Sequence, residues 1–195
     1  VHTFFIEGHN MHTYYTNADP KISTLEHSDK HAVKMCVEYA QLLSTAHRLL
    51  DGKEYAGKSK TGRNVKRWKH PTDFMEENLM LACHTKHPSA IWCRETKGNY
   101  SWLLHLLKHL LKEFTYRYGK RHSVEDRIPY LNMLPQNINM TPEITQMPQC
   151  MPEYCKIPNN PLAAYKNYYI KEKTKFATWK NRSVPSWFQE KDIGI

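Results

Sequence analysis

Apolar residues recur at helical spacing along much of the chain, and the clearest stretch covers residues 28–50. Ser28 and Asp29 are favourable N-cap residues at its start, and Gly52 lies where glycine commonly stops a helix. The apolar positions between these limits share one helical face. They predict a single buried stripe made of Val33, Cys36, Val37, Ala40, Leu43 and Leu50.

Three further stretches show the same helical spacing: residues 72–83, 88–118 and 161–173. The dipeptide His87-Pro88 opens the second stretch, because proline fits the first turn of a helix. We expect this stretch to hold two helices with a bend near Lys97 and Gly98, and Gly119 ends the second. The chain is therefore predicted to be mainly α-helical.

Three segments lack helical spacing. Residues 3–6 are apolar and suit a short strand or an extended arm. Residues 52–70 hold seven basic residues, three glycines and one acidic residue, Glu54, which predicts a flexible basic loop. Residues 129–161 hold seven of the eleven prolines, and this density predicts an extended Pro-rich strap rather than a helix. The predicted fold is a compact single-domain helical bundle over residues 1–195, with little or no β structure.

The composition supports a folded chain with a sizeable core, since 40% of the 195 residues are hydrophobic and 12% are aromatic. The formal net charge of +9 favours nucleic acid or an anionic membrane surface as a partner. The five cysteines form no Cys-x-x-Cys pair, which is typical of a reducing environment. No apolar run reaches the ~20 residues of a membrane span, and the first residues do not resemble a signal peptide. We expect a cytoplasmic protein with no membrane partner.

The densest group of chemically competent side chains lies on the first predicted helix. Four of them share one face opposite the apolar stripe, at intervals of three or four residues: His31, Lys34, Glu38 and Gln41. Lys30 lies four residues before Lys34, and two neighbouring cations suit an anion site or a nucleophilic amine. The alternative interpretation is a solvated helix face that carries an ion pair between Lys34 and Glu38.

A second group lies near the predicted bend, between residues 87 and 102. Trp92 and Tyr100 suit stacking on a base, although aromatic residues at helical spacing also suit a core. Arg94 suits a phosphate or a carboxylate, because a guanidinium within an apolar helix needs an anionic partner. The cation-rich residues 113–122 end the second of these helices and suit either the helix dipole or phosphate contacts.

Motifs for metals and nucleotides are missing from the sequence. Cys83, His84 and His87 lie close together, and Cys150 precedes Cys155 by five residues, but neither set has the paired spacing of a structural zinc site. The glycine-rich phosphate-binding motifs of nucleotide-driven motors and kinases are also missing. We therefore expect no metal and no cofactor.

Several motifs are specific enough to compare with known families. The longest are residues 27–35 (His-Ser-Asp-Lys-His-Ala-Val-Lys-Met), 38–43 (Glu-Tyr-Ala-Gln-Leu-Leu), 87–94 (His-Pro-Ser-Ala-Ile-Trp-Cys-Arg) and 99–102 (Asn-Tyr-Ser-Trp). Shorter ones follow at residues 116–119, 148–152, 164–169 and 187–188. Together they resemble a family of small tailed-phage DNA-modification proteins, and the resemblance covers nearly the whole chain.

The resemblance implies one of two enzymes. The chain looks like the amino acid:DNA transferases of phage thymidine hypermodification, which use an amino acid amine to displace pyrophosphate from an activated 5-hydroxymethyl pyrimidine in DNA. Its helical layout is also similar to the phage pyrimidine-dimer DNA glycosylases, which use an amine nucleophile with a glutamate.

In the glycosylase family the nucleophile is the N-terminal α-amine. Here a longer segment precedes the first predicted helix, so Lys30 or Lys34 would form the Schiff base instead. We favour the transferase over the glycosylase/AP lyase. A non-catalytic DNA-binding accessory protein is the second alternative.

For the transferase we predict a complete set of roles. Lys30, His31 and Lys34 neutralise the leaving pyrophosphate, and Glu38 takes a proton from the incoming amine. The substrate-binding set is Arg94 for the amino acid carboxylate, Trp92 or Tyr100 for stacking on a flipped base, and Asn99 and Gln41. The DNA backbone is held by Lys58, Lys60, Arg63, Lys66, Arg67, Lys175, Lys180 and Arg182. The expected partners are double-stranded DNA and a free amino acid in the cytoplasm of an infected bacterium, and the oligomeric state is left open.

Overall fold

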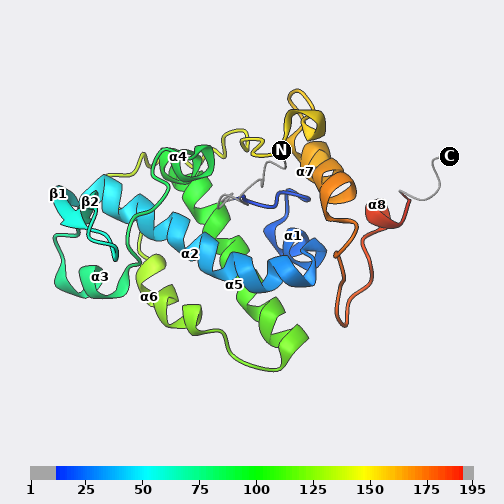
Figure 1. Cartoon of the computed structure of the whole chain (residues 1–195), viewed down its shortest axis with the longest axis horizontal. Coiled ribbons are helices and arrows are strands. Elements are labelled where there is room, and N and C mark those ends of the chain that lie inside the picture. Colours follow the sequence, from blue (N-terminus) through cyan, green and yellow to red (C-terminus); the bar gives the residue numbers. More distant parts are fainter. Residues whose placement is uncertain (1–11, 191–195) are drawn as a thin grey trace.

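α-Helices make up most of the regular structure in the computed structural model, which describes residues 12–190 (Figure 1). The strand or arm predicted at residues 3–6 lies outside the described residues. In chain order the helices and strands are α1 (Pro20–Glu26), α2 (Asp29–Asp51), β1 (Lys53–Lys58), β2 (Asn64–Lys69), α3 (Asp73–Asn78), α4 (Pro88–Glu95), α5 (Lys97–Tyr118), α6 (Ile128–Leu131), α7 (Pro161–Tyr168) and α8 (Ser186–Gln189). The predicted mainly-α class is confirmed, and no helix of the described chain is long and apolar enough to cross a membrane.

Helix α2 runs through the middle of the molecule and packs against α4 and α5 (Figure 1). The predicted stripe is right for Cys36, Ala40 and Leu43, which are buried, but wrong for Val33 and Val37, which are 43% and 38% exposed. Two polar residues of the opposite face, His31 and Glu38, are buried instead. The reason is that α2 is covered on several sides, so its polar face also turns toward other parts of the chain.

A buried arginine joins the start of α2 to the end of α5. The guanidinium of Arg117 donates to the Glu113 carboxylate at 2.8 Å, to the Asp29 carboxylate at 3.0 Å and to the carbonyl oxygen of His27 at 2.8 Å. These partners satisfy the buried charge. The cation-rich end of α5 is therefore partly structural, because this arginine is 2% exposed.

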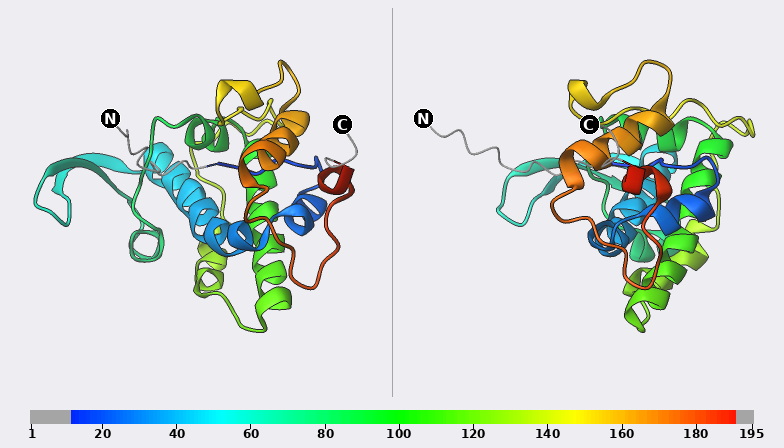
Figure 2. Two further views of the ribbon diagram at one scale, coloured as in Figure 1. Left: turned by 45° about the vertical axis from the view of Figure 1, so that its right-hand side comes forward. Right: turned by 90° about the vertical axis from the view of Figure 1, so that its right-hand side faces the viewer.

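Residues 52–70 form an antiparallel β-hairpin, so the predicted flexible loop is wrong. β1 and β2 pair over their whole length, with Tyr55 opposite Arg67. Gly62 has a φ of 79° in the turn, a conformation that glycine adopts without strain. Charge and glycine content hide the strand preference of residues such as Val65 and Trp68. The hairpin projects from the helical body (Figure 2).

A second buried arginine fixes the base of this hairpin, since a two-stranded ribbon is marginal on its own. Arg48 is 1% exposed, and its guanidinium donates to the Trp68 carbonyl oxygen at 2.8 Å and to the Glu76 carboxylate at 2.6 Å. It also binds the carbonyl oxygens of Leu79 and Met80. These carbonyl oxygens accept hydrogen bonds from Arg48 and not from backbone N–H groups of a longer helix, so α3 ends at Asn78, before the end of the predicted helix 72–83.

The predicted strap, residues 129–161, is helical at both ends, because residues 129–131 belong to α6 and Pro161 begins α7. Residues 132–160 hold a short 3₁₀ helix (Glu153–Cys155) and several turns but no α-helix or strand, as expected from their prolines. This strap lies over the junction of α4 and α5. A Cβ atom on Gly98 would lie 2.3 Å from the carbonyl oxygens of Pro142 and Glu143, so only glycine permits this close approach. The predicted bend between the two helices therefore coincides with the point where the strap crosses them.

Candidate active site

The first half of α2 carries an amine and a carboxylate in contact. Lys34 Nζ lies 3.2 Å from Glu38 Oε1, one helical turn away. The lysine side chain is 52% exposed and the glutamate side chain is 11% exposed, so the pair spans the boundary between solvent and interior. Exposed pairs of this kind contribute little stability. A largely buried carboxylate beside an accessible amine is, however, well placed to accept a proton from a ligand at the surface.

Aromatic rings form a wall behind this pair. The ring of His31 stacks on Tyr14 with 3.9 Å between centroids, and His31 Nδ1 lies 2.6 Å from Tyr169 Oη. Tyr169 Oη accepts the backbone N–H of Ser28 at 3.1 Å, so its own proton is available for His31 Nδ1. Burial lowers the pKa of His31 well below 6.5, so the ring is neutral at neutral pH. His31 therefore fits a positioning role and not the predicted neutralisation of pyrophosphate.

A second buried histidine, His12, lies on the same side of the molecule. Its Nε2 is 3.5 Å from Tyr168 Oη. Burial and, to a lesser extent, the positive charges of Lys173 and Lys34 together lower the pKa of His12 to about 3. Burial and the same two lysines also lower the pKa of His31. Lys173 Nζ lies 4.8 Å from the centroid of Tyr168, the ring whose hydroxyl is next to His12.

Lysines from α2 and from the π turn Tyr169–Lys173 meet at one aromatic ring. Lys30 Nζ lies 4.5 Å and Lys173 Nζ 5.6 Å from the centroid of Phe176. Cation–π contacts hold an ammonium group without neutralising its charge. Lys30 and Lys173 therefore lie together at Phe176, and Lys34, which pairs with Glu38, is one turn beyond Lys30 on α2. We call this group the α2 site; it consists of His12, Tyr14, Lys30, His31, Lys34, Glu38, Tyr168 and Lys173.

A cavity of about 400 Å³ adjoins the α2 site. His12 belongs to both, because it lines the cavity and contacts Tyr168. The other lining residues come from the start of α4 and from the strap: His87, Pro88, Gln149, Cys150, Met151, Pro152 and Lys156. The volume lies at the lower end of the range of small-molecule sites, and it suits a ligand the size of an amino acid.

The predicted base-stacking residues do not fit that role. Trp92 is 2% exposed and donates its indole N–H to the Thr145 carbonyl oxygen at 3.0 Å. Tyr100 is fully buried and donates to the Leu131 carbonyl oxygen at 2.7 Å. Asn99 is also fully buried, and its side chain binds both Trp92 and Thr145. All three hold the core or the strap, so a base could not reach them without displacing the strap.

Arg94 and Gln41 are more accessible. Arg94 Nη2 donates to the Thr85 carbonyl oxygen at 2.9 Å, in the loop that leads to His87. Arg94 Nη1 is buried and has no hydrogen-bond partner among residues 12–190. Gln41 is half-buried, one turn beyond Glu38 on α2. Both remain compatible with a substrate contact.

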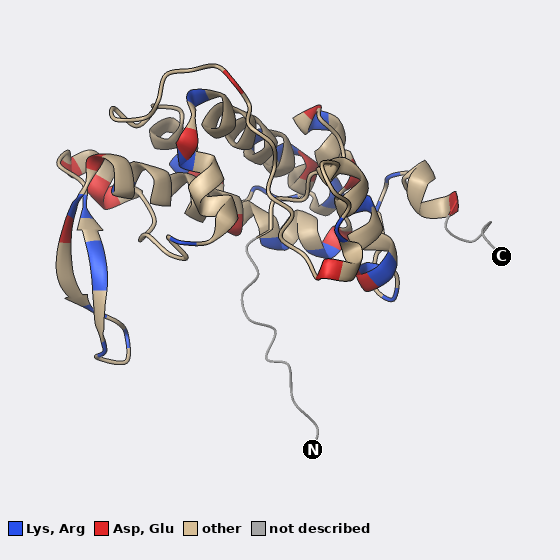
Figure 3. Ribbon diagram, turned by 90° about the horizontal axis from the view of Figure 1, so that it is seen from above, with Lys and Arg blue, Asp and Glu red and all other residues tan. Residues whose placement is uncertain are grey.

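The predicted DNA-contacting residues divide into two groups. Lys58, Lys60, Arg63 and Lys66 are exposed on the hairpin and Arg67 is half-buried there; Figure 3 shows basic segments along both strands and the turn. Lys175 is exposed, whereas Lys180 Nζ lies over Tyr118 at 5.3 Å. Arg182 donates to both oxygens of Glu113, at 2.9 and 3.0 Å, so a phosphate would have to compete with this carboxylate.

Four residues of the α2 site were not predicted: His12, Tyr14, Tyr168 and Lys173. They come from segments before α1 and after the strap, and nothing in their local spacing links them to α2. The nearest sequence signal is the aromatic run Tyr165, Tyr168 and Tyr169, which helical periodicity alone assigns to a core.

The arrangement combines an excess of positive charge, a carboxylate able to accept a proton and a neighbouring cavity for a small ligand. These are the elements of a transfer reaction in which an anionic group leaves. Among known proteins, neither a family model nor a curated protein nor a solved structure matches the chain.

Proposed function

We propose that the chain is an amino acid:DNA transferase that acts on an activated 5-hydroxymethyl pyrimidine in DNA. The observation that carries this proposal is the contact of Lys34 with Glu38 on the same helix that brings Lys30 to Phe176, where the ammonium group of Lys173 also lies. A non-catalytic helix face needs neither the buried aromatic wall nor lysines supplied by a segment far away in the sequence. The resemblance to phage DNA-modification proteins supports the same reaction class.

The charge of the α2 site suits a pyrophosphate leaving group. Lys30, Lys34 and Lys173 supply positive charge, and Glu38 is the acidic member of the α2 site. Cations placed where negative charge develops stabilise the transition state. Because His31 is neutral, this proposal assigns pyrophosphate to the three lysines and leaves the imidazole to hold Tyr14 and Tyr169 in place.

The proposed reaction has one bond-forming step. The amino acid nitrogen attacks the methylene carbon on C5 of the pyrimidine, the new C–N bond forms and the C–O bond to pyrophosphate breaks. The α-amino group of a free amino acid is largely protonated at neutral pH, so it must lose a proton to attack. Glu38 takes the proton that the nitrogen releases, and pyrophosphate leaves with the electron pair of the broken bond.

The co-substrate also carries a carboxylate that needs a cation. Arg94 remains our proposal for this contact, because its Nη1 has no partner among the described residues and its Nη2 holds the loop that leads to His87. His87 lines the 400 Å³ cavity with His12. DNA would be held through the hairpin, whose contacts with phosphates are independent of sequence and sensitive to salt.

One observation also supports the glycosylase/AP lyase. Lys34 offers an accessible amine beside a carboxylate, the combination that a Schiff-base mechanism uses. In that reaction the amine attacks C1′ of the sugar, the base leaves, and the resulting imine can be trapped by borohydride. The accessory-protein alternative requires DNA binding alone.

The test is mass spectrometry of nucleosides from DNA that carries pyrophosphorylated 5-hydroxymethyluracil, after incubation with the protein and a mixture of amino acids. A new nucleoside heavier by one amino acid supports the transferase and identifies the co-substrate. If no adduct forms, but ultraviolet-irradiated DNA shows abasic sites or a borohydride-trapped crosslink to the protein, the glycosylase/AP lyase replaces the transferase as the proposed function. DNA binding without either product would favour the non-catalytic DNA-binding accessory protein.

A further inference from the structure

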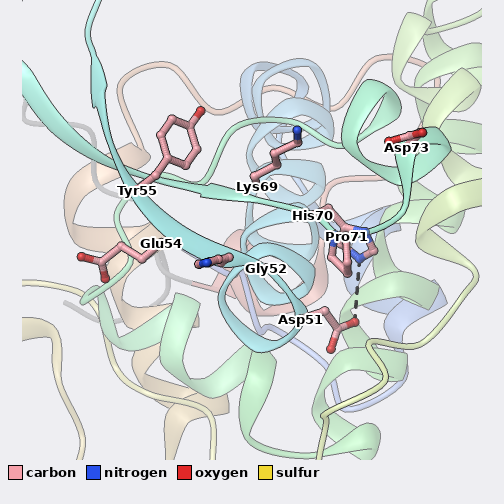
Figure 4. A pocket seen from close by; sticks show the side chains of 9 residues that line it. Asp51, Gly52, Glu54, Tyr55, Lys69, His70, Pro71 and Asp73 are labelled. Atoms are coloured by element: carbon pink, nitrogen blue, oxygen red, sulfur yellow. Dashed lines mark ion pairs between the residues drawn. The ribbon is translucent and has the colours of Figure 1, made fainter.

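A second cluster of reactive side chains lies at the base of the hairpin. His47 and Asp51 are one turn apart at the end of α2, and His70 directly follows β2. Their candidate ligand atoms all lie within 4.8 Å of one another. His70 Nε2 is 3.9 Å from Asp51 Oδ2, and both side chains are nearly fully buried (Figure 4). The cluster therefore joins the two chain ends of the hairpin.

The hydrogen bonds of His47 leave a lone pair directed at this cluster. Tyr100 Oη donates to the Leu131 carbonyl oxygen at 2.7 Å, so it must accept a proton from His47 Nε2, 2.8 Å away. The proton of the neutral His47 ring is therefore on Nε2, and Nδ1 is an acceptor. His47 is 1% exposed, and its Nδ1 has no hydrogen-bond partner in the described chain. Metal-bound histidines are commonly oriented in this way through their second nitrogen.

The strap orients the carboxylate of Asp51. Asp51 Oδ2 accepts the backbone N–H of Gln136 at 2.8 Å, and Oδ1 accepts the backbone and side-chain N–H groups of Asn137, each at 3.0 Å. These bonds fix the plane of the carboxylate while Oδ2 keeps a second lone pair. The oxygen nearest to His70 can therefore accept a further partner.

His70 contributes the third nitrogen. Its Nε2 is buried and has no hydrogen-bond partner in the described chain, while its Nδ1 accepts the backbone N–H of Thr72 at 3.1 Å. Coordination through Nε2 moves the single proton of the neutral ring to Nδ1 and so replaces this one hydrogen bond by a metal–nitrogen bond. His70 is 6% exposed, and a buried imidazole nitrogen without a hydrogen-bond partner is rare in proteins.

We propose that His47 Nδ1, Asp51 Oδ2 and His70 Nε2 bind one divalent transition-metal ion of the zinc class. Two imidazoles and a carboxylate are a donor set that zinc prefers. Tetrahedral bonds of ~2.1 Å place ligand atoms about 3.4 Å apart, so atoms that lie within 4.8 Å of one another need to approach by at most about 1.4 Å. Small side-chain rotations supply such a movement.

The proposed metal site borders a cavity on the side of Asp51 and His70. A cavity of about 480 Å³ lies beside Asp51 and His70, and its wall includes Tyr55, Lys69 and Asp73 (Figure 4). Three protein ligands with one open position are typical of zinc sites that bind water or a substrate oxygen. Glu38 and Asp51 are about 20 Å apart along α2, at 1.5 Å per residue, so this metal site is separate from the α2 site.

The test is titration of metal-free protein, prepared without a polyhistidine tag, with Co²⁺ at neutral pH. Cobalt reports four- or five-coordinate binding through its visible absorption, and Zn²⁺ should displace it. We expect one equivalent to bind. His70→Ala should lower the affinity by more than the about 10–100-fold that follows loss of an outer-shell partner. The matched control is His105→Ala, an exposed histidine on α5.

A second measurement keeps the test decisive if His70→Ala alters the fold. Asp51→Asn keeps one carbonyl oxygen for the strap, and its far-ultraviolet circular dichroism should match that of the unsubstituted protein. Zn²⁺ should raise the thermal midpoint of the unsubstituted protein and of His105→Ala, but not that of Asp51→Asn. Absence of stoichiometric binding, or equal affinity in His70→Ala and His105→Ala, would overturn the proposed metal site.

Discussion

The two halves of α2 hold their charged side chains in different ways. In the first half, the ammonium group of Lys30 lies against the ring of Phe176, and Lys34 pairs with Glu38 at the surface. In the second half, the guanidinium of Arg48 is buried and donates to the Glu76 carboxylate and to carbonyl oxygens of several neighbouring segments. The cations in the first half of α2 thus remain able to bind an anion, whereas the hydrogen-bond donors of Arg48 in the second half all bind protein atoms.

This difference distinguishes side chains that can bind a ligand from side chains that stabilise the fold, and it does so more clearly than burial or charge alone. A guanidinium whose donors all bind protein atoms has no capacity left for a ligand. An ammonium held on a ring face keeps its charge and remains able to bind an anion. We therefore assign the chemistry to the first half of α2 and the attachment of the hairpin to the second half.

The largest effect on stability is expected at Arg48. Arg48→Ala leaves the Glu76 carboxylate and several carbonyl oxygens without their donor, so it should lower the free energy of unfolding by about 3–5 kcal/mol. Urea denaturation measures the change. The control is Arg63→Ala on the exposed hairpin turn, which should change stability by no more than about 0.5 kcal/mol. Equal effects of the two substitutions on the free energy of unfolding would contradict a structural role for Arg48 in the second half of α2.

A somewhat smaller effect is expected from acid at the start of α2. His27 is fully buried between Ser23 and Tyr39, and burial lowers its pKa from 6.5 to about 4. The unfolded chain takes up this proton below pH 6.5, whereas the folded chain takes it up only near pH 4. Stability is therefore fully present above pH 6.5 and falls between pH 6.5 and 4, by on the order of 3 kcal/mol.

Urea denaturation at several pH values measures this dependence. His27→Gln cannot take up the proton, so its stability should depend less on pH across the same interval. The exposed residue His105 provides the control, since His105→Gln should keep the full dependence. If His27→Gln and the unsubstituted protein have the same pH profile, then His27 is not the group that titrates.

The smallest effect is expected on DNA affinity. The combined substitutions Lys58→Ala, Lys60→Ala and Arg63→Ala remove three exposed charges from the hairpin. The slope of log affinity against log salt should become less steep by about 3, since each phosphate contact contributes about 0.9. A variant of equal charge, with alanine at Lys86, Lys112 and Lys120, should keep the original slope. Identical slopes would place the DNA contact elsewhere.

The helices were predictable where periodicity and capping agreed. The sequence pattern predicts α2, the break between α4 and α5, and the start of α7, because each has an apolar repeat with a proline or glycine at one end; α8 was not predicted. It fails at the hairpin, where basic charge conceals the strand preference of Trp68. It also fails at α3, since the carbonyl oxygens that Arg48 captures are determined by tertiary contacts and not by local propensity.

The candidate site was predictable only where it lies on one helix. Lys34 and Glu38 follow from the spacing on α2. Lys173 follows the strap in the sequence and contacts Phe176 together with Lys30, but no local sequence spacing predicts this contact. Trp92 was assigned to base stacking, but contact with the strap makes it a core residue. The sequence likewise suggested no metal, because His70 joins His47 only when the hairpin folds back onto α2.

The most direct test of the proposed chemistry is amino acid transfer by Glu38→Gln, measured by nucleoside mass spectrometry together with DNA affinity. The substitution keeps the shape of the side chain and removes its ability to accept a proton. We predict a loss of turnover of about 10²–10⁴-fold, typical of a missing general base, with unchanged DNA affinity. Glu77→Gln, an exposed residue on α3, should behave like the unsubstituted protein. Full turnover by Glu38→Gln would contradict the assignment of the reaction to the first half of α2.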